Sequence, residues 1–209
     1  MLRAALTAAM LTTLLGGCSA LGALGGAAKP LDAYEISAPA AGPVARGRPQ
    51  SVDMIVAVPT ASGAIDTDRI LVRPLPTQVQ YLPDARWIEN APLMIQSALV
   101  DGLERSGAFR YVGRKPLGAY GDFALVSNLA EFHAEIVPET DSATVRVRLT
   151  ARLVREEDAT VLGTQTFEAT AVSSDTSTEG IVDAYDRAAS RAIQGILEWV
   201  LDTRGVRTG

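Results

Sequence analysis

The clearest pattern in the chain is a strict alternation of apolar and polar residues over 143–155, ATVRVRLTARLVR. Its apolar positions are Val145, Val147, Leu149, Ala151 and Leu153. Because successive side chains of a strand point to opposite faces, this run predicts a strand with one buried face and one face in water. Residues 122–136 and 160–172 are also β-rich, and short polar connections join the three runs. We therefore expect an antiparallel meander.

Shorter apolar runs precede the meander. Residues 52–59 are almost continuously apolar, which favours a central strand covered on both faces. Residues 68–73 and 77–82 flank the sequence PLP and predict two short strands around a tight turn. Residues 109–113, FRYVG, predict a further strand.

Two segments have helical periodicity. Residues 90–107 begin with Asn90 as a candidate cap, carry Pro92 in the first turn and end at Gly107. Residues 84–87, just ahead, predict an additional turn. The sequence therefore predicts one helix between the early strands and the meander.

The second helix is the last element of the chain. Thr176 and Glu179 have the spacing of a capping box, and Gly205 is a natural terminator. An apolar stripe follows steps of three and four residues: Ile181, Tyr185, Ala188, Ala192, Ile196 and Trp199. The predicted fold class is α+β, a mixed, mostly antiparallel sheet with two long helices packed on one face.

The amino-terminal residues have the pattern of an export signal. Residues 1–17 contain one positive side chain, Arg3, then an apolar run and two small residues, as in a secretory signal peptide. The run is shorter than the roughly 20 apolar residues that span a bilayer. We expect residues 1–17 to be a cleaved signal.

The signal ends in LGGC, residues 15–18, which resembles a bacterial lipobox. This resemblance implies that Cys18, the only cysteine, carries a diacylglycerol and that the new amino terminus receives a further acyl chain such as palmitate. Stable anchoring needs more than one acyl chain. Ser19 is not aspartate, which by the enterobacterial sorting rule implies the outer membrane, with the inner membrane as the alternative.

Residues 18–50 are rich in Ala, Gly and Pro, a composition that favours a flexible tether. Residues 34–36 are predicted to form a short strand within it. The predicted organisation is therefore a signal over 1–17, a tether over 18–50 and a domain over 51–204.

Composition and motifs point away from catalysis. The net charge is −5, which gives no indication of nucleic-acid binding. The single histidine, His133, lies in a predicted strand, where a structural or solvated role is favoured over a catalytic one. Residues 156–158, EED, favour a solvated turn over a calcium site because the ligand spacing of a calcium loop is missing. We predict no metal, no cofactor and no enzymatic activity.

Two sets of side chains are candidates for recognition. Arg146, Arg148 and Arg152 share one face of a predicted strand, which is either a solvated face or a docking surface for an acidic partner or lipid headgroup. Trp87 and Trp199 are interpreted as core or interface anchors at helical positions, with ligand binding as the alternative.

Several short motifs occur in a fixed order: YEISAP (34–39), VAVP (56–59), DTDRILVR (66–73), VQYLPDARW (79–87) and LVDGLERSGAFRYV (99–112). With the later meander and final helix, this order resembles the auxiliary lipoproteins of ABC-type transport systems. These include components associated with MCE (mammalian cell entry) proteins.

The resemblance implies a non-enzymatic lipoprotein that docks a periplasmic MCE protein. Through that protein it would work with a permease and an ATPase that move lipids between the inner and outer membranes. Self-association into a ring is a further expectation. The alternatives are a general envelope-assembly or secretion-assisting lipoprotein without an MCE partner, and a periplasmic hydrolase.

Overall fold

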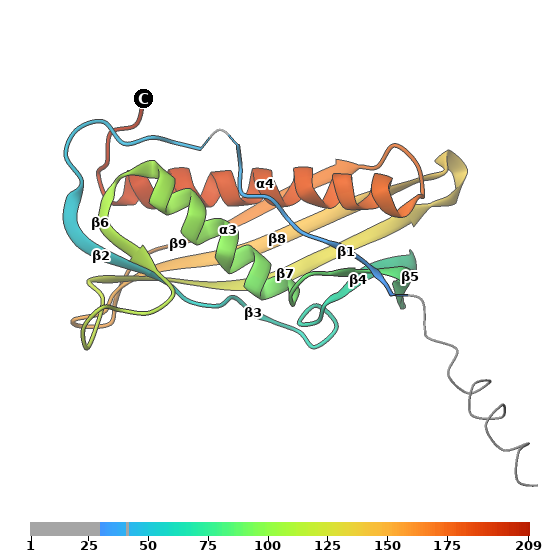
Figure 1. Ribbon diagram of the computed structural model, residues 1–209, viewed down its shortest axis with the longest axis horizontal. Helices are drawn as coiled ribbons and strands as arrows, with labels where there is room; N and C mark the ends of the chain where they lie inside the picture. Colours follow the sequence, from blue (N-terminus) through green and yellow to red (C-terminus); the bar gives the residue numbers. More distant parts are fainter. Residues whose placement is uncertain (1–29, 41) are drawn as a thin grey trace, which may run out of the picture. The chain divides into compact units, whose positions relative to one another are not determined.

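The computed structural model describes residues 30–40 and 42–209, and the folded unit runs from Asp32 to Gly209. The predicted signal peptide, the predicted lipid anchor Cys18 and the sorting residue Ser19 lie outside the described residues. Figure 1 shows the folded unit, in which a curved sheet carries two helices. The predicted α+β class with two helices is confirmed.

The described residues form two α-helices, one short 3-10 helix and nine strands. The helices are α3 (Ala91–Ser106), α4 (Thr178–Thr203) and η1 (Pro138–Thr140). The strands are β1 (Asp32–Tyr34), β2 (Gln50–Val56), β3 (Thr60–Ala61), β4 (Arg69–Leu75), β5 (Gln78–Trp87), β6 (Phe109–Gly113), β7 (Phe123–Val137), β8 (Ser142–Arg155) and β9 (Thr160–Val172).

Strand β7 organises the sheet. Along one edge it pairs antiparallel with β8, which in turn pairs antiparallel with β9, so the predicted meander is confirmed. Along its other edge, β2, β3 and β4 pair in parallel with successive parts of β7, through Met54–Phe123, Thr60–Asn128 and Val72–Ala134. Three short segments of the early chain therefore share one long edge of a later strand.

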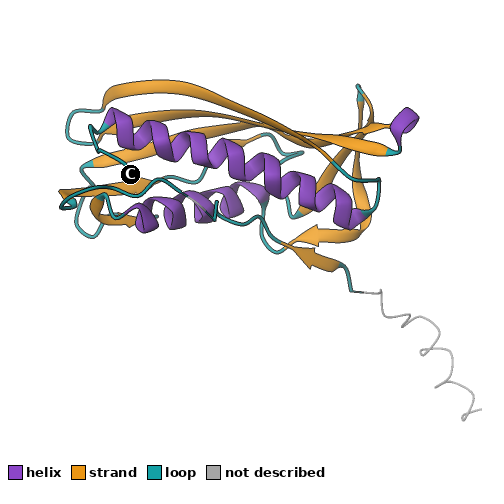
Figure 2. Ribbon diagram, turned by 90° about the horizontal axis from the view of Figure 1, so that it is seen from above, coloured by secondary structure: helices purple, strands orange, loops and turns teal. Residues whose placement is uncertain are grey.

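The alternation in β8 sorts its side chains as predicted. Its five apolar positions are buried on the face toward the helices, and α4 packs across β8 and β9. Arg146 and Arg152 are exposed on the opposite face, which no helix covers. Figure 2 shows both helices on the same face of the sheet.

Helix α4 and strand β9 interlock through two glycine–aromatic contacts. A Cβ atom added to Gly195 of α4 would lie 3.0 Å from Cδ1 of Phe167 in β9. A Cβ atom added to Gly163 of β9 would lie 3.1 Å from Cζ2 of Trp199 in α4. The Phe167 and Trp199 rings also contact each other edge to face, with centroids 5.8 Å apart. Trp199 is thus a packing anchor, as predicted.

Trp87 occupies the centre of the core and not a helix. Residues 84–87, predicted as a turn, are the end of β5, so that prediction is wrong. The Trp87 ring is fully buried against Phe132 and Tyr185, with centroids 5.8 and 5.2 Å away. Burying this large ring outweighs the local turn preference, and the predicted core role is confirmed.

The helix ends differ from prediction in their caps. Ser177, not Thr176, caps α4: its hydroxyl accepts a hydrogen bond from the Gly180 N–H at 3.1 Å. The Glu179 carboxylate instead accepts a hydrogen bond from the Tyr34 hydroxyl at 3.3 Å, so no capping box forms. Gly205 follows the helix with φ +65°, which confirms the predicted terminator.

Helix α3 starts without a side-chain cap. The Asn90 side chain donates to Asp66 instead, so its predicted capping role is wrong. Pro92 lies in the first turn and Gly107 ends the helix in the left-handed conformation, both as predicted.

The domain begins earlier than predicted. Strand β1 pairs in parallel with β5, Ile36 is buried, and the Ser37 N–H donates to Asp186 of α4 at 2.7 Å. The Ala45 N–H donates to the Ser106 carbonyl at 2.8 Å. Of the predicted tether, the described residues from Asp32 onward therefore belong to the folded unit, because backbone hydrogen bonds to distant elements compensate for a weakly apolar composition.

Substitution of Val147 by Asp should destabilise the protein by roughly 4 kcal/mol, because it buries a carboxylate between β8 and α4 without a partner. The matched control is Arg152→Asp, which changes a neighbouring exposed position of β8 and should cost less than about 1 kcal/mol. Urea unfolding of the two variants measures both values. Equal losses would contradict the assignment of the two faces.

Ser177→Ala should lower stability by about 1 kcal/mol, since it removes the acceptor for the Gly180 N–H at the start of α4. Thr176→Ala should have a clearly smaller effect because Thr176 makes only an exposed hydrogen bond to Asp141. Thermal unfolding compares the two variants. A larger loss for Thr176→Ala would place the cap at Thr176 after all.

Candidate functional site

The three arginines predicted as a docking surface lie on the open face of the sheet, but two of them are already paired. Arg146 Nε lies 2.9 Å from Glu135 Oε2, and Arg148 Nη2 lies 2.7 Å from Glu131 Oε1. Both glutamates belong to β7. This part of the face is a ladder of opposite charges, which agrees better with a solvated face than with a cationic surface.

The pKa values agree with this pairing. Burial opposes ionisation of Glu135, but hydrogen bonds from Arg146 and His133 outweigh it, so the Glu135 pKa lies below its usual value. The hydrogen bond to Glu135 likewise raises the pKa of Arg146. The pair stays ionised across the physiological range.

Arg152 differs from its two neighbours. It is exposed and forms no ion pair with any residue that the structure describes. Its cross-strand partners are Val126 and Thr164, and the adjacent pair Val154–Val161 continues the same face. Val126 is 36% exposed and Val161 is 52% exposed. Arg152 thus lies beside a small exposed apolar patch.

His133 has a structural environment. Its side chain is buried, and Nε2 lies 3.3 Å from Glu135 Oε1. Burial lowers the His133 pKa, so the ring is neutral at physiological pH. Within residues 30–40 and 42–209, no group of three or more His, Cys, Asp or Glu side chains has the arrangement of a metal site.

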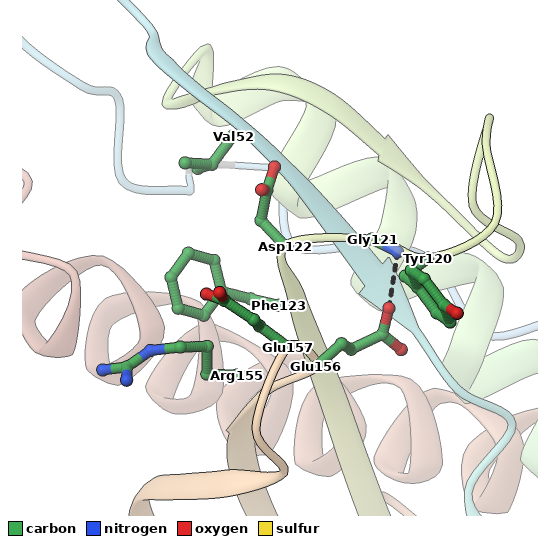
Figure 3. Close-up of a pocket in the computed structure, with 8 residues that line it drawn as sticks. All are labelled: Val52, Tyr120, Gly121, Asp122, Phe123, Arg155, Glu156 and Glu157. Carbon is green, nitrogen blue, oxygen red and sulfur yellow. Dashed lines mark hydrogen bonds between the residues drawn. The ribbon is translucent and has the colours of Figure 1, made fainter.

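A cleft of about 740 Å³ opens where β7 begins and β8 ends (Figure 3). It is lined by Val52, Tyr120, Gly121, Asp122, Phe123, Arg155, Glu156 and Glu157. The Gly121 N–H donates to Glu156 Oε2, which joins the loop before β7 to the β8–β9 turn. Residues 156–158 were predicted to form a solvated turn. In the structure, Glu156 and Glu157 line the cleft, and Asp158 forms an ion pair with Arg155.

Hydrogen bonds hold the opposite wall of the cleft. Asp122 accepts from the Asp53 N–H at 2.7 Å, and Arg110 Nε donates to Asp53 Oδ1 at 2.8 Å. The Arg204 guanidinium lies 3.8 Å from the centroid of the Phe123 ring. Burial lowers the Arg204 pKa, in keeping with this stacked and partly covered position. These contacts hold Asp122 and Phe123, two residues of the cleft lining, against neighbouring elements.

Exposed apolar side chains surround the cleft. Tyr120 is 78% exposed and Leu117 is 71% exposed, both in the loop between β6 and β7. Sequence reasoning missed them, although apolar residues within the turn-forming stretch KPLGAYGD were an available signal. We name the cleft together with Leu117, Tyr120, Val126, Val161 and Arg152 the cleft end. Strand alternation puts Phe123 and Arg155 of the cleft on the helix side of the sheet, and Val126 and Arg152 at the same end on its open face.

The cleft end lies far from the point where the chain enters the fold. Near that entry, Tyr34 contacts Glu179 at the start of α4, whereas Arg204, which stacks on Phe123, directly follows the end of α4. A 26-residue helix is about 39 Å long. Figure 1 shows β1 and the β8–β9 turn at opposite ends of the folded unit.

The cleft presents side chains of several chemical kinds. Its lining offers carboxylates, one arginine and aromatic surface, but no serine, cysteine or histidine nucleophile or base.

Neither α3 nor α4, nor any other helix within the described part, has both the length and the apolar character needed to cross a bilayer.

Solved structures share this fold. Protein XCC0632 from Xanthomonas campestris, assigned to the DUF330 family, matches with a TM-score of 0.71 and 26% sequence identity, over 84% of this chain and 96% of that one. An uncharacterised protein matches with a TM-score of 0.59 and 11% identity, over 82% and 99% of the two chains. No curated protein matches the chain.

The family described as "ABC-type transport auxiliary lipoprotein component" matches residues 34–196. This range runs from the last residue of β1 to Ile196 in α4, and it includes α3 and the complete meander. The motif order seen in the sequence and the fold lead to the same result, and the chain belongs to the family of ABC-type transport auxiliary lipoprotein components.

Proposed function

We propose that this auxiliary lipoprotein is a non-catalytic outer-membrane component of an MCE-type lipid transport system. In this proposal, Cys18 anchors the chain, and the folded unit docks the periplasmic MCE protein. Energy comes from the ATPase and permease of the same system. The observation that carries the proposal is the cleft end, where exposed apolar side chains, carboxylates and arginines lie at the end of the fold opposite to the entry of the chain.

The composition of the cleft end supports a docking role. Protein interfaces concentrate their binding energy in a few aromatic and arginine side chains with apolar surroundings. Tyr120, Leu117 and Arg152 supply these side chains from two segments, the β6–β7 loop and β8. The cleft, on the helix side of this end and lined in part by Tyr120, offers a concave seat for a partner side chain or loop.

The charge pattern favours the cleft end over the whole arginine face. Arg146 and Arg148 must lose their contacts with Glu135 and Glu131 before they can bind an acidic partner, which offsets the gain. Arg152 has no such pair to break among the described residues. We therefore restrict the docking role predicted for the three arginines to Arg152.

The double variant Leu117→Ala/Tyr120→Ala should weaken binding to the periplasmic region of the cognate MCE protein by at least about tenfold, the effect of losing hot-spot contacts. Surface plasmon resonance with the detergent-solubilised full chain measures this change. Leu75→Ala/Val79→Ala is the matched control, because these side chains are also exposed but belong to the β4–β5 hairpin.

Arg152→Glu should mainly lower the association rate, and this effect should shrink at high salt. Arg146→Glu should change the rate less, because Arg146 lies six residues along β8 from Arg152, roughly 20 Å farther from the cleft and beyond the screening length. If neither the cleft-end variants nor Arg152→Glu alters binding, another surface docks the partner. If the wild-type chain shows no binding, only a general envelope lipoprotein role remains.

Cys18→Ala should abolish membrane fractionation, because no acyl chain can be attached. Mass spectrometry of the amino-terminal peptide of the wild-type protein should show acylated Cys18, and a free thiol there would contradict the anchor. Ser19→Asp should shift the protein to the inner membrane. Unchanged outer-membrane fractionation of Ser19→Asp would show that this residue does not control sorting.

A further inference from the structure

A second, smaller hollow lies just beyond the carboxyl end of α4 and has a distinctly basic lining. Its volume is about 220 Å³, and it is lined by Ala45, Arg46, Arg48, Gln50, Ala108, Gly205, Val206 and Arg207. Three of these eight residues are arginines, and none is acidic. All three arginines are exposed, so their guanidinium groups are accessible from solvent.

Backbone pairing brings the arginines together from distant parts of the chain. The Arg46 N–H donates to the Arg207 carbonyl at 2.7 Å, next to a bridge between Ala45 and Thr208. Gly47 has φ +105°, a backbone conformation that favours glycine, and it separates Arg46 from Arg48 at the hollow. The fold thus places like charges on paired backbone segments, an arrangement that costs energy without a counter-charge.

Among the described residues, no ion pair compensates these arginines, and the Arg46 guanidinium packs against Gly209. Arg46, Arg48 and Arg207 make neither an ion pair nor a side-chain hydrogen bond with those residues. Arg105, Arg110, Arg146 and Arg148 are, by contrast, paired with carboxylates. Arg152 also lacks an ion pair, but it stands alone, whereas the hollow gathers three arginines without one.

Gln50 fixes the wall between this hollow and the cleft. Its Nε2 donates to the Arg204 carbonyl at 2.8 Å, and its Oε1 accepts from Arg204 Nη2 at 3.2 Å. This reciprocal pair keeps Arg204 on Phe123 and satisfies a carbonyl just past α4. The negative end of the α4 dipole amounts to about half a charge, so three full positive charges outweigh it.

We propose that the hollow formed by Arg46, Arg48 and Arg207 is a binding site for a phosphate group. Guanidinium groups match phosphate oxygens through paired, charge-assisted hydrogen bonds. A bound phosphate would compensate the cluster and join the 44–48 segment to the end of α4. This site is separate from the docking proposal and does not depend on an MCE partner.

The phosphate has two sources, a free anion or the headgroup of a phospholipid. Isothermal titration calorimetry of the full chain in a neutral detergent distinguishes them, with inorganic phosphate as one probe and short-chain phosphatidylglycerol as the other. A short-chain diacylglycerol is the control without phosphate. Both phosphate probes should bind, and tighter binding of phosphatidylglycerol would identify the headgroup as the ligand.

The variant Arg46→Gln/Arg207→Gln should weaken phosphate binding by roughly tenfold or more, the effect of losing charge-assisted hydrogen bonds. The control Arg146→Gln/Arg187→Gln removes the same charge at two arginines that are paired with carboxylates elsewhere, and it should leave binding unchanged. Arg48→Gln provides an independent test, because Arg48 takes no part in the Ala45–Thr208 pairing and its loss should not affect folding.

Two results would overturn the proposal. One is the absence of heat with either phosphate probe at about 10 mM, where a site lined by three guanidinium groups should be largely occupied. The other is equal weakening by the control pair and by the hollow variants, which would show a general charge effect.

Discussion

The packing of α4 onto the inner face of β8 and β9 is the interaction on which the rest of the fold depends. The apolar stripe of α4 faces the buried side chains of β8, and glycines on each element receive an aromatic ring of the other, Gly195 for Phe167 and Gly163 for Trp199. Close packing of this kind leaves little freedom for the helix to slide or rotate. Tyr185 adds a fixed point, since its hydroxyl donates to the Leu71 carbonyl of β4.

This packing also determines where the surfaces of interest lie. Because one helix covers the length of the meander, the entry of the chain at Asp32 and the cleft end are held at opposite ends of α4. The open face of the sheet remains free of helices, and its charges largely neutralise one another. In the proposed function, the two ends, and not the broad face, therefore provide the separate surfaces for the anchor and for the partner.

The long elements were predictable because the spacing of apolar residues along the chain indicates which side chains are buried, as β8 and α4 show. Features that depend on tertiary hydrogen bonds were not: the segment from Asp32 to Gln50 has a loop-like composition but is held by Asp186 and Ser106. Ser177 and Thr176 both carry a hydroxyl that can cap a helix. The local backbone geometry decides that Ser177 accepts the hydrogen bond from the Gly180 N–H, and the sequence does not show this geometry. The cleft combines a loop, a turn and two strand ends, and sequence periodicity carries no information about such a combination.

The central claim is that the cleft end faces the partner in the cell. Photo-crosslinking in intact cells, with a photoreactive amino acid at Tyr120 in one strain and at Arg146 in another, tests it directly. The account predicts that the probe at Tyr120 captures the MCE protein and that the probe at Arg146, on the neutralised part of the sheet, does not. Capture from Arg146 alone would contradict it and return the docking role to the open face of the sheet.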